Sequence, residues 1–324
     1  MFMFVRRGCQ AFFLAMLFSS AALAQSWPAR PVKLIVSQAA GGTPDIMARI
    51  LAERLSAALG QPVLVENRPG SANMVGAQAA ARSAPDGYTL FFATAAALVT
   101  NPHTFKSLPY DPVKDFTPIG MVGKAMFMIL AHPSVSANTL QELVALDKAD
   151  PGKLAFATDG PRNFSGMVAA WFNRVAGTRI LIVPYNAMPQ GLQDTVAGRT
   201  QLVILAIPSA APFVKRGDLR PIAISSAARV PGYEDVPAVA ETYPGFDLTG
   251  WFALVAPVGT PVEAVRRVNR ESERILSDPE IAQRLRALGL YTDGAGTPES
   301  TGEFIRAERE RWALLVNQIG IQPE

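Results

Sequence analysis

The 324-residue sequence contains few of the residues on which enzyme chemistry most often depends. It has one cysteine and two histidines, His103 and His132, which are far apart and each adjacent to a proline. The cysteine, Cys9, lies in an N-terminal segment discussed below, so the rest of the chain offers no disulfide, thiolate nucleophile or cysteine-bound metal. Two isolated histidines are typical of loop or surface positions and do not indicate a metal site.

Motifs for common reactions are also missing. The sequence has no Gly-x-Gly-x-x-Gly segment and no phosphate-binding Gly-Lys-Ser/Thr loop. Ser165 lacks the glycine two residues earlier that a nucleophile elbow requires, and both histidines precede it. The sequence therefore favours a protein that is not an enzyme and that uses neither a cofactor nor a metal.

Charge is sparse and nearly balanced. Lys and Arg total 30, Asp and Glu total 27, and the charged fraction of 18% is below the usual ~25%. Without a concentrated basic stripe, a nucleic-acid partner is not expected. The 49% hydrophobic content argues against disorder, and the length is enough for two domains of about 100–200 residues each.

Residues 1–24 are typical of a cleaved secretory signal peptide. Arg6 and Arg7 supply positive charge, residues 11–18 form an apolar run, and Ala22-Leu23-Ala24 matches a cleavage site. The run is shorter than the roughly 20 residues that span a bilayer, and no later segment is long enough. We therefore expect a secreted protein that lies outside the cytoplasm, without stable membrane insertion after cleavage.

Beyond this segment, short β-branched runs alternate with segments of helical periodicity, which is typical of mainly parallel sheets covered by helices. The proline-rich stretch 101–118 predicts an irregular connection. Strands are expected at 32–36, 63–65, 88–92, 154–157, 180–183, 202–206 and 221–224, and helices at 44–59, 74–82, 168–172, 192–196, 261–276, 280–288 and 298–319.

Three loops follow predicted strands and precede predicted helices. Open α/β sheets bind ligands at the carboxyl ends of strands, where helix N-termini attract anions. The first loop is Gly41-Gly42-Thr43, with Thr43 as the expected N-cap of a helix starting at Pro44. An ordinary capped turn is the alternative. Asp45, in the first helical turn, would repel an anion, so we expect its side chain to point away.

The second loop is Asp159-Gly160-Pro161-Arg162-Asn163, in which Asn163 is a candidate N-cap. The third is Tyr185-Asn186, although a buried tyrosine is more often part of a core. If the three loops converge, they form one cleft for a small anion.

The order and spacing of many short segments closely resemble the Bug (TctC-type) solute receptors of tripartite tricarboxylate transporters. The resemblance extends from about Trp27 to the C-terminus. The matching segments are VKLIVSQAAGGTPDIMAR (32–49), VENRPG (65–70), PDGYTL (85–90), LPYDP (108–112), KDFTPI (114–119), VPY (183–185), Asp194, Gly198, Val236-Pro237, Ala240-Glu241 and Trp251.

This resemblance implies a two-domain periplasmic binding protein of type II-like α/β fold, in which a ligand cleft separates two mainly parallel sheets flanked by helices. The chain would cross near Lys124 and Trp251, so that residues 25–124 and 252–324 form domain 1 and residues 125–251 form domain 2. The implied activity is that of a monomeric receptor that captures a small carboxylate and delivers it to membrane permease subunits. A solitary sensor that presents its closed form to a signalling partner, or a periplasmic enzyme on a similar scaffold, are the alternatives.

By position, the family's ligand loops fall on residues 37–45, around Thr94, on 160–165 and on 185–186. The resemblance therefore implies the following ligand-binding residues: Gln38, Gly41, Gly42, Thr43, Asp45, Thr94, Gly160, Arg162, Asn163, Ser165, Tyr185 and Asn186.

The sequence also departs from the family pattern inside these loops. Arg162 adds a charge that can bind a carboxylate bidentately, unless it faces solvent. No ligand identity is carried over from the family for this reason. Gln38 replaces an aromatic residue of the family, Ala40 replaces a proline, and Asn186-Ala187 replaces Lys-Gly. The second loop of the family commonly reads Gly-x-Gly-Ser/Thr-x-x-His. In this chain Arg162 replaces its second Gly, Asn163 replaces its Ser/Thr, and Gly166 replaces its His.

Overall fold

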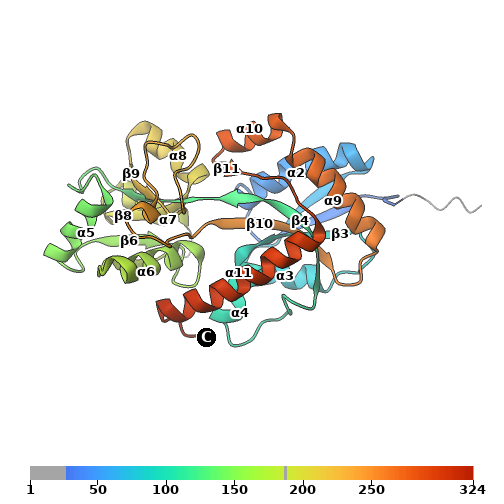
Figure 1. Cartoon of the computed structure of the whole chain (residues 1–324), viewed down its shortest axis with the longest axis horizontal. Coiled ribbons are helices and arrows are strands. Elements are labelled where there is room, and N and C mark those ends of the chain that lie inside the picture. Colours follow the sequence, from blue (N-terminus) through green and yellow to red (C-terminus); the bar gives the residue numbers. More distant parts are fainter. Residues whose placement is uncertain (1–26, 186–187, 324) are drawn as a thin grey trace, which may run out of the picture.

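The computed structural model describes residues 27–185 and 188–323, which form two lobes, each built on one β-sheet (Figure 1). The expected signal peptide with Cys9, and the candidate ligand residue Asn186, lie outside the described residues. None of the helices formed by the described residues is both long and apolar enough to cross a bilayer.

The first lobe contains a six-stranded sheet of order β11-β4-β10-β3-β1-β2. Its strands are β1 (Val32–Val36), β2 (Val63–Asn67), β3 (Thr89–Thr94), β4 (Phe116–Ala125), β10 (Gly250–Pro257) and β11 (Leu290–Tyr291). Its helices are α2 (Thr43–Leu59), α3 (Met74–Ala81), the π-helix η1 (Ala96–Thr100), α4 (Asn101–Thr104), α9 (Val262–Leu276), α10 (Pro279–Ala287) and α11 (Pro298–Ile319).

The second lobe contains a five-stranded sheet of order β7-β6-β8-β5-β9. Its strands are β5 (Phe127–Ala131), β6 (Ala155–Thr158), β7 (Leu181–Pro184), β8 (Leu202–Ala206) and β9 (Arg220–Ile224). Its helices are α5 (Leu140–Ala149), α6 (Phe164–Ala176), α7 (Met188–Val196), α8 (Ile207–Arg216) and the 3-10 helix η2 (Val239–Glu241).

The α/β class with two sheets is confirmed, but both sheets are mixed. Strand β1 is parallel to β2 and β3, and β6 is parallel to β7 and β8, as the strand–helix alternation predicts. In each sheet one interior strand runs against its neighbours: β10 is antiparallel to β3 and β4, and β5 is antiparallel to β8 and β9. Because β3 and β4 are both antiparallel to β10, the crossing strand β4 keeps the direction of β1, β2 and β3.

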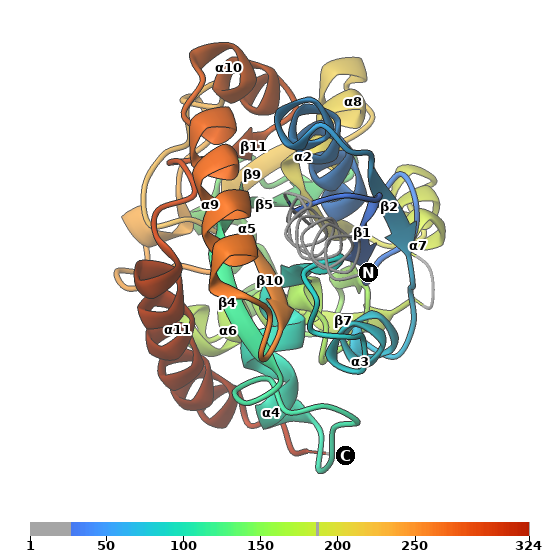
Figure 2. The ribbon, with the colours of Figure 1, turned by 90° about the vertical axis from the view of Figure 1, so that its right-hand side faces the viewer.

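Helices cover both faces of the first sheet because residues along its strands alternate between two cores. Leu34 and Phe92 pack with α2, α9 and α10, whereas Ile35 and Phe91 pack with α3, η1 and α11. This alternation is the period of two expected for a strand. Figure 2 shows the two helical layers on either side of the strands.

The chain passes between the sheets at two places. Strands β4 and β5 are separated only by Met126, so one long ribbon leaves the first sheet and enters the second (Figure 1). The return segment is tied to the second sheet by Ser225, whose Oγ donates to the Leu248 carbonyl at 2.6 Å, and then continues into β10. Helix α11 packs against elements of both lobes, including β4 and α6.

The connection 101–118 begins with a helical turn, α4, which the sequence prediction missed. Pro102 lies within the first two helical positions, where its missing N–H costs no hydrogen bond. The turn is fastened by Asn101, whose Nδ2 donates to the Ala72 carbonyl at 2.8 Å. A tertiary contact therefore stabilises a helix that is too short to form alone.

Candidate functional site

A cavity of about 240 Å³ lies where the two lobes meet. It is lined by the loops after β1, β3, β6 and β8 and by the segments that cross between the lobes. These loops follow the carboxyl ends of strands, where α/β sheets bind their ligands. A larger depression of about 550 Å³ lies at the opposite ends of β1 and β3 and contains the ion pairs Arg30–Asp86 and Lys33–Glu66. Its position makes it the weaker candidate.

The first lobe contributes the N-terminus of α2 to the cavity. Gly42, Thr43 and Pro44 line it, together with Gln38 before them and Thr94 at the end of β3. Gly42 is the N-cap of α2 and forms no side-chain cap hydrogen bond. The helix therefore presents its positive end and the N–H groups of its first turn toward the cavity.

Thr43 was expected to be the N-cap, but it is the first helical residue and the cap is Gly42. Pro44 is accordingly displaced by one position from the predicted helix start. The difference has a physical reason, since Gly and Thr both cap helices well and proline is accepted throughout the first turn.

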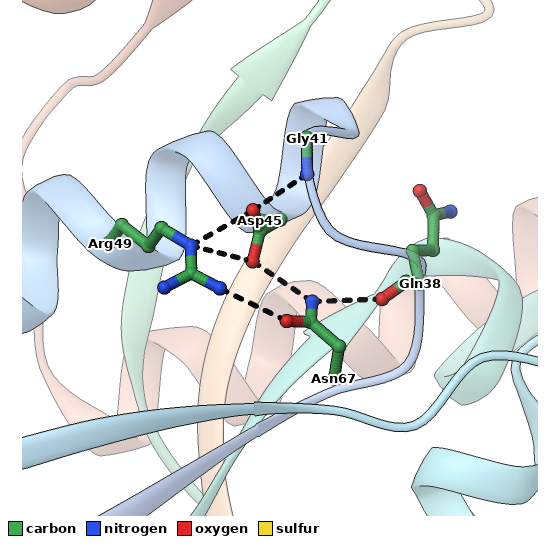
Figure 3. Close-up of polar contacts among 5 residues, drawn as sticks. All are labelled: Gln38, Gly41, Asp45, Arg49 and Asn67. Carbon is green, nitrogen blue, oxygen red and sulfur yellow. Dashed lines mark hydrogen bonds and ion pairs between the residues drawn. The ribbon is translucent and has the colours of Figure 1, made fainter.

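Asp45 lies beneath the α2 loop and holds its shape (Figure 3). Its carboxylate accepts hydrogen bonds from the Gly41 N–H at 2.8 Å, from Arg49 Nε at 3.0 Å and from Asn67 Nδ2 at 2.9 Å. Asn67 Nδ2 also donates to the Gln38 carbonyl at 3.0 Å. Burial by itself raises the pKa of Asp45, but the hydrogen bonds from Arg49, Gly41 and Asn67 outweigh it and hold that pKa below its usual value. Asp45 thus points away from the cavity, as expected.

A strained segment completes this side of the cavity. Ser71, Ala72 and Asn73 all have positive φ angles, of 47°, 50° and 73°. Non-glycine residues adopt this region only where surrounding contacts enforce it. Here Ser37 Oγ donates to Asn73 Oδ1 at 3.0 Å, and Gly76 lets α3 approach β1 so closely that a Cβ would lie 2.7 Å from Ser37 Cα. The strain positions Asn73 in the cavity lining.

The second lobe contributes the N-terminus of α6, and here an acidic side chain occupies the helix end. Ser165 Oγ donates to Asp159 Oδ1 at 2.5 Å, and the Asp159 N–H donates back to Ser165 Oγ at 2.9 Å. Burial raises the pKa of Asp159, while hydrogen bonds from Ser165 and from the backbone N–H groups of residues 159, 165 and 166 oppose that rise. Both side chains line the cavity.

Gly166 allows the second-lobe loop to fold back onto α6. A Cβ at this position would lie 2.0 Å from the Gly160 carbonyl oxygen and 2.9 Å from Pro161 Cα. Asn163 closes the same turn, because its Nδ2 donates to the Asp159 carbonyl at 2.5 Å. Asn163 is the N-cap by backbone position, although its side chain makes no cap hydrogen bond to the helix.

Aromatic side chains form the apolar wall of the cavity. Phe127 from β5 and Phe164 from α6 stack with ring centroids 4.5 Å apart, and Trp251 lies at the start of β10. Trp251 Nε1 donates to Glu308 Oε2 on α11 at 2.9 Å, which fixes the indole orientation. Phe164 also contacts Trp312 of α11, with centroids 5.9 Å apart. The wall is therefore built from both lobes, and α11 supports it from behind through Glu308 and Trp312.

The structure brings some of the expected ligand residues together and leaves others outside. Those that line the cavity are Gln38, Gly42, Thr43, Thr94, Asn163 and Ser165. Gly41, Asp45 and Gly160 shape the loops from behind. Tyr185 is turned away, since its hydroxyl donates to Asp194 Oδ2 at 2.8 Å.

Arg162, expected to be a possible second charge for a dicarboxylate, does not line the cavity. Its Nη2 donates to the Gln322 carbonyl at 3.2 Å, near the C-terminus of the chain. Pro161 is exposed and Arg162 is half-buried, and neither lines the cavity, whereas Asp159 of the same turn does. The sequence predicts the basic side chain of Arg162 at the ligand, whereas in the structure the acidic side chain of Asp159 lines the cavity.

Several lining residues were not among those expected. Asp159, Asn73, Ser209, Phe127, Phe164 and Trp251 all line the cavity. Within the described residues the lining contains no Lys, Arg or His, and no cluster of three or more His, Cys, Asp or Glu is arranged to hold a metal.

Two α/β lobes joined by crossing strands, with a polar cavity at their junction, are the architecture of solute-binding proteins that close by hinge motion. Comparison with known proteins identifies the family. The sequence model of the tripartite tricarboxylate transporter family receptor, TctC, matches residues 47–321. A UPF0065 protein of Bordetella bronchiseptica is 37% identical over 303 residues, covering 94% of this chain and 90% of that protein. The protein BugT of Bordetella pertussis is 34% identical over 299 residues, covering 92% and 91%.

Solved structures of relatives share the fold. The structure of Rpa4515 of R. palustris with adipate has a TM-score of 0.86 and 30% identity, and covers 92% of this chain and 100% of that one. MatC of Rhodopseudomonas palustris with bound malate has a TM-score of 0.80 and 29% identity, and covers 90% and 100%. The chain belongs to the TctC family of tripartite tricarboxylate transporter receptors, and the resemblance to Bug proteins is confirmed.

Proposed function

We propose that this protein is a periplasmic receptor that captures a small carboxylate between its two lobes and delivers it to the permease of a tripartite tricarboxylate-type transporter. The observation that carries this proposal is the N-terminus of α2 at the cavity, where Gly42 caps the helix without a side-chain hydrogen bond. Backbone N–H groups and the helix dipole suit an anion there without any basic side chain. The Thr43 hydroxyl adds a further donor.

Relatives with ligands support the same chemistry. The structures similar to this chain include one with adipate and one with malate, both small carboxylates. The cavity of about 240 Å³ is smaller than the roughly 300–1,000 Å³ of drug-sized sites, which fits a small metabolite. We further propose that the two lobes are the two domains of the receptor, that they close by bending at Met126 and at the segment before β10, and that residues 1–24 direct secretion.

The test is binding of carboxylates by protein from which copurified ligands have been removed by unfolding and refolding. Thermal shift and calorimetry would use monocarboxylates, dicarboxylates and amino-carboxylates of two to eight carbons, plus benzoate-type acids. We expect at least one acid to raise the melting temperature, because a ligand that binds only the folded state stabilises it. The uncharged alcohol or amide of each acid is the matched control. A protein that responds to no acid, or equally to acid and amide, would contradict the proposal.

A further inference from the structure

The two polar ends of the cavity carry opposite electrostatic character. On the first lobe, α2 presents the positive end of its dipole at Gly42 and Thr43. On the second lobe, the equivalent end of α6 is already occupied, because Asp159 accepts hydrogen bonds from Ser165 Oγ and from backbone N–H groups of the helix start. The hydrogen-bond donors with which the start of α6 would bind an anion are therefore already bound to the protein's own carboxyl group.

No basic side chain of the described residues compensates this carboxyl group within the cavity lining. Residues 186–187, which the structure does not describe, are Asn and Ala and carry no charge. The donors that stabilise the ionised form of Asp159 are neutral. The only charged side chain among the described lining residues is thus acidic. The aromatic wall of Phe127, Phe164 and Trp251 lowers the local dielectric constant, which strengthens its effect on any charged ligand.

We propose that Asp159 determines ligand specificity by selecting a carboxylate whose other end bears a positively charged nitrogen, and by rejecting dicarboxylates. This inference rests on the proposed function, since it assigns the ligand's carboxylate to the α2 end. A second carboxylate would be placed beside Asp159 in a partly apolar site, where like charges repel strongly. An ammonium group would instead pair with Asp159, and its N–H groups would form charge-assisted hydrogen bonds.

The pKa of Asp159 is consistent with this geometry. Burial raises that pKa, so ionising the carboxyl group without a cation beside it is unfavourable. A cation bound next to it favours the ionised form, and the same coupling favours binding of the cation. Two acidic residues behind the lining do not contribute, because Arg49 and Asn67 pair with Asp45 beneath the loop and Arg311 pairs with Glu308 on α11.

The experiment uses pairs of ligands that differ only at one end. Refolded full-length protein is titrated by calorimetry with succinate, glutarate, adipate and benzene-1,4-dicarboxylate. The matched partners are 4-aminobutanoate, 5-aminopentanoate, 6-aminohexanoate and 4-(aminomethyl)benzoate. We expect the amino-carboxylate to bind at least about tenfold more tightly than its dicarboxylate partner in every pair that binds, a difference of about 1.4 kcal/mol.

The variant Asp159→Asn keeps the shape of the side chain and removes its charge. We expect it to lose the preference, with amino-carboxylate affinity falling about tenfold and dicarboxylate affinity rising. Asp218→Asn is the control, since Asp218 pairs with Arg216 on the surface of the second lobe and its removal changes the net charge equally. We expect that control to leave the ratio of affinities unchanged. Melting temperatures identify a variant that fails to fold, and the wild-type pairs test the inference without any variant.

The outcomes separate the two proposals. If no acid of either series binds and the monocarboxylates fail as well, the proposed function fails together with the inference. If only monocarboxylates bind, the function stands and the specificity assigned to Asp159 is overturned. If dicarboxylates bind as tightly as their amino partners or more tightly, the function stands and the specificity assigned to Asp159 is overturned. That result would mean that Asp159 is protonated and donates to the ligand. If Asp218→Asn changes the ratio as much as Asp159→Asn, overall charge rather than the cavity residue sets the preference, and the inference is again overturned.

Discussion

Helices α2 and α6 both begin at the cavity, yet their N-termini differ in whether an acidic side chain binds the helix start. Helix α2 begins after Gly42, an N-cap with no side-chain hydrogen bond, and its nearby acid, Asp45, is held beneath the loop by Arg49. Helix α6 begins beside Asp159, whose carboxyl group reaches the start of its own helix from the cavity side. Two helix ends of similar topology can therefore attract ligands of opposite charge, and the position of one aspartate decides which.

The largest loss of stability is expected from adding a side chain at Gly166, where its absence lets the second-lobe turn fold back onto α6. Gly166→Ala places a Cβ 2.0 Å from the Gly160 carbonyl oxygen, so the turn must move. We expect a loss of about 3 kcal/mol of unfolding free energy, measured by urea denaturation, and impaired binding. The matched control on the same helix is Gly177→Ala, which has open space around it and should lose only about 1 kcal/mol, from its φ of +63°. Equal losses in both variants would mean that the turn is not tightly packed on α6.

Removing the acid under α2 should have the next largest effect. Asp45→Asn loses charge-assisted hydrogen bonds from Arg49 and Gly41 and should cost about 2 kcal/mol of unfolding free energy. An exposed acid provides the control, because Asp150→Asn breaks only a surface pair with Lys153 and should change stability by less than about 1 kcal/mol. If Asp45→Asn is as mild as this control, the loop is held by other contacts.

The same two aspartates should respond to pH in opposite directions. The pKa of Asp45 is lowered in the folded protein, so its contribution to stability is present above the unfolded pKa of about 3.9 and is lost as pH falls toward the folded value. The pKa of Asp159 is raised, so its contribution is present below about 3.9 and is lost as pH rises through the folded value. Denaturation of wild type, Asp45→Asn and Asp159→Asn from acid to neutral pH tests this. Asp159→Asn should gain relative to wild type as pH rises, and Asp45→Asn should lose. Parallel curves for the two variants would refute the contrast.

A smaller effect is expected at the mouth of α2. Thr43→Val removes a hydroxyl donor that lines the cavity and keeps the side-chain shape. We expect ligand affinity, measured by calorimetry, to fall by about 1–2 kcal/mol, the scale of one hydrogen bond to a charged group. Thr89→Val, at the opposite end of β3, should leave affinity unchanged. An unaltered affinity in Thr43→Val would exclude the hydroxyl from ligand contact.

The smallest effect is expected at the basic residue that the turn directs outward. Arg162 contacts the Gln322 carbonyl and does not line the cavity, so Arg162→Ala should weaken mono- and dicarboxylates equally, by less than about 0.5 kcal/mol. Arg174→Ala, an exposed change on α6, serves as the reference. A selective loss of dicarboxylate binding would place Arg162 at the ligand and would reverse the comparison between the two helix ends.

The sequence predicts the α2 end of the cavity well, but it does not predict which residue of the second-lobe loop lines the other end. The α2 loop is predictable because Gly41-Gly42-Thr43-Pro44 after a β-branched strand combines turn, cap and helix-start signals. Asp159 was predicted to belong to a loop of the cleft but not to the ligand-binding residues, because Asp-Gly-Pro signals a turn without indicating which side chain lies inside it. That choice depends on Gly166, whose missing side chain matters only once the chain has folded back.

The crossing strands show a second limit. Phe127 and Trp251 belong to apolar strands, and periodicity alone does not say which face of such a strand meets a cavity. Their direction follows from the register of β5 with β8 and of β10 with β4, which is a tertiary property. The helices and strands that the sequence does predict lie within a few residues of the observed ones, but α5, α8, β4, β5 and β10 were not predicted. The aromatic wall, which β5 and β10 help to form, therefore required the assembled lobes.

The placement of Trp251 has a practical consequence. The sequence contains four tryptophans, and Trp251 is the one that lines the cavity while its indole nitrogen is fixed by Glu308. Ligand binding in the cavity should therefore change the intrinsic fluorescence of Trp251, so that binding can be followed without an attached dye.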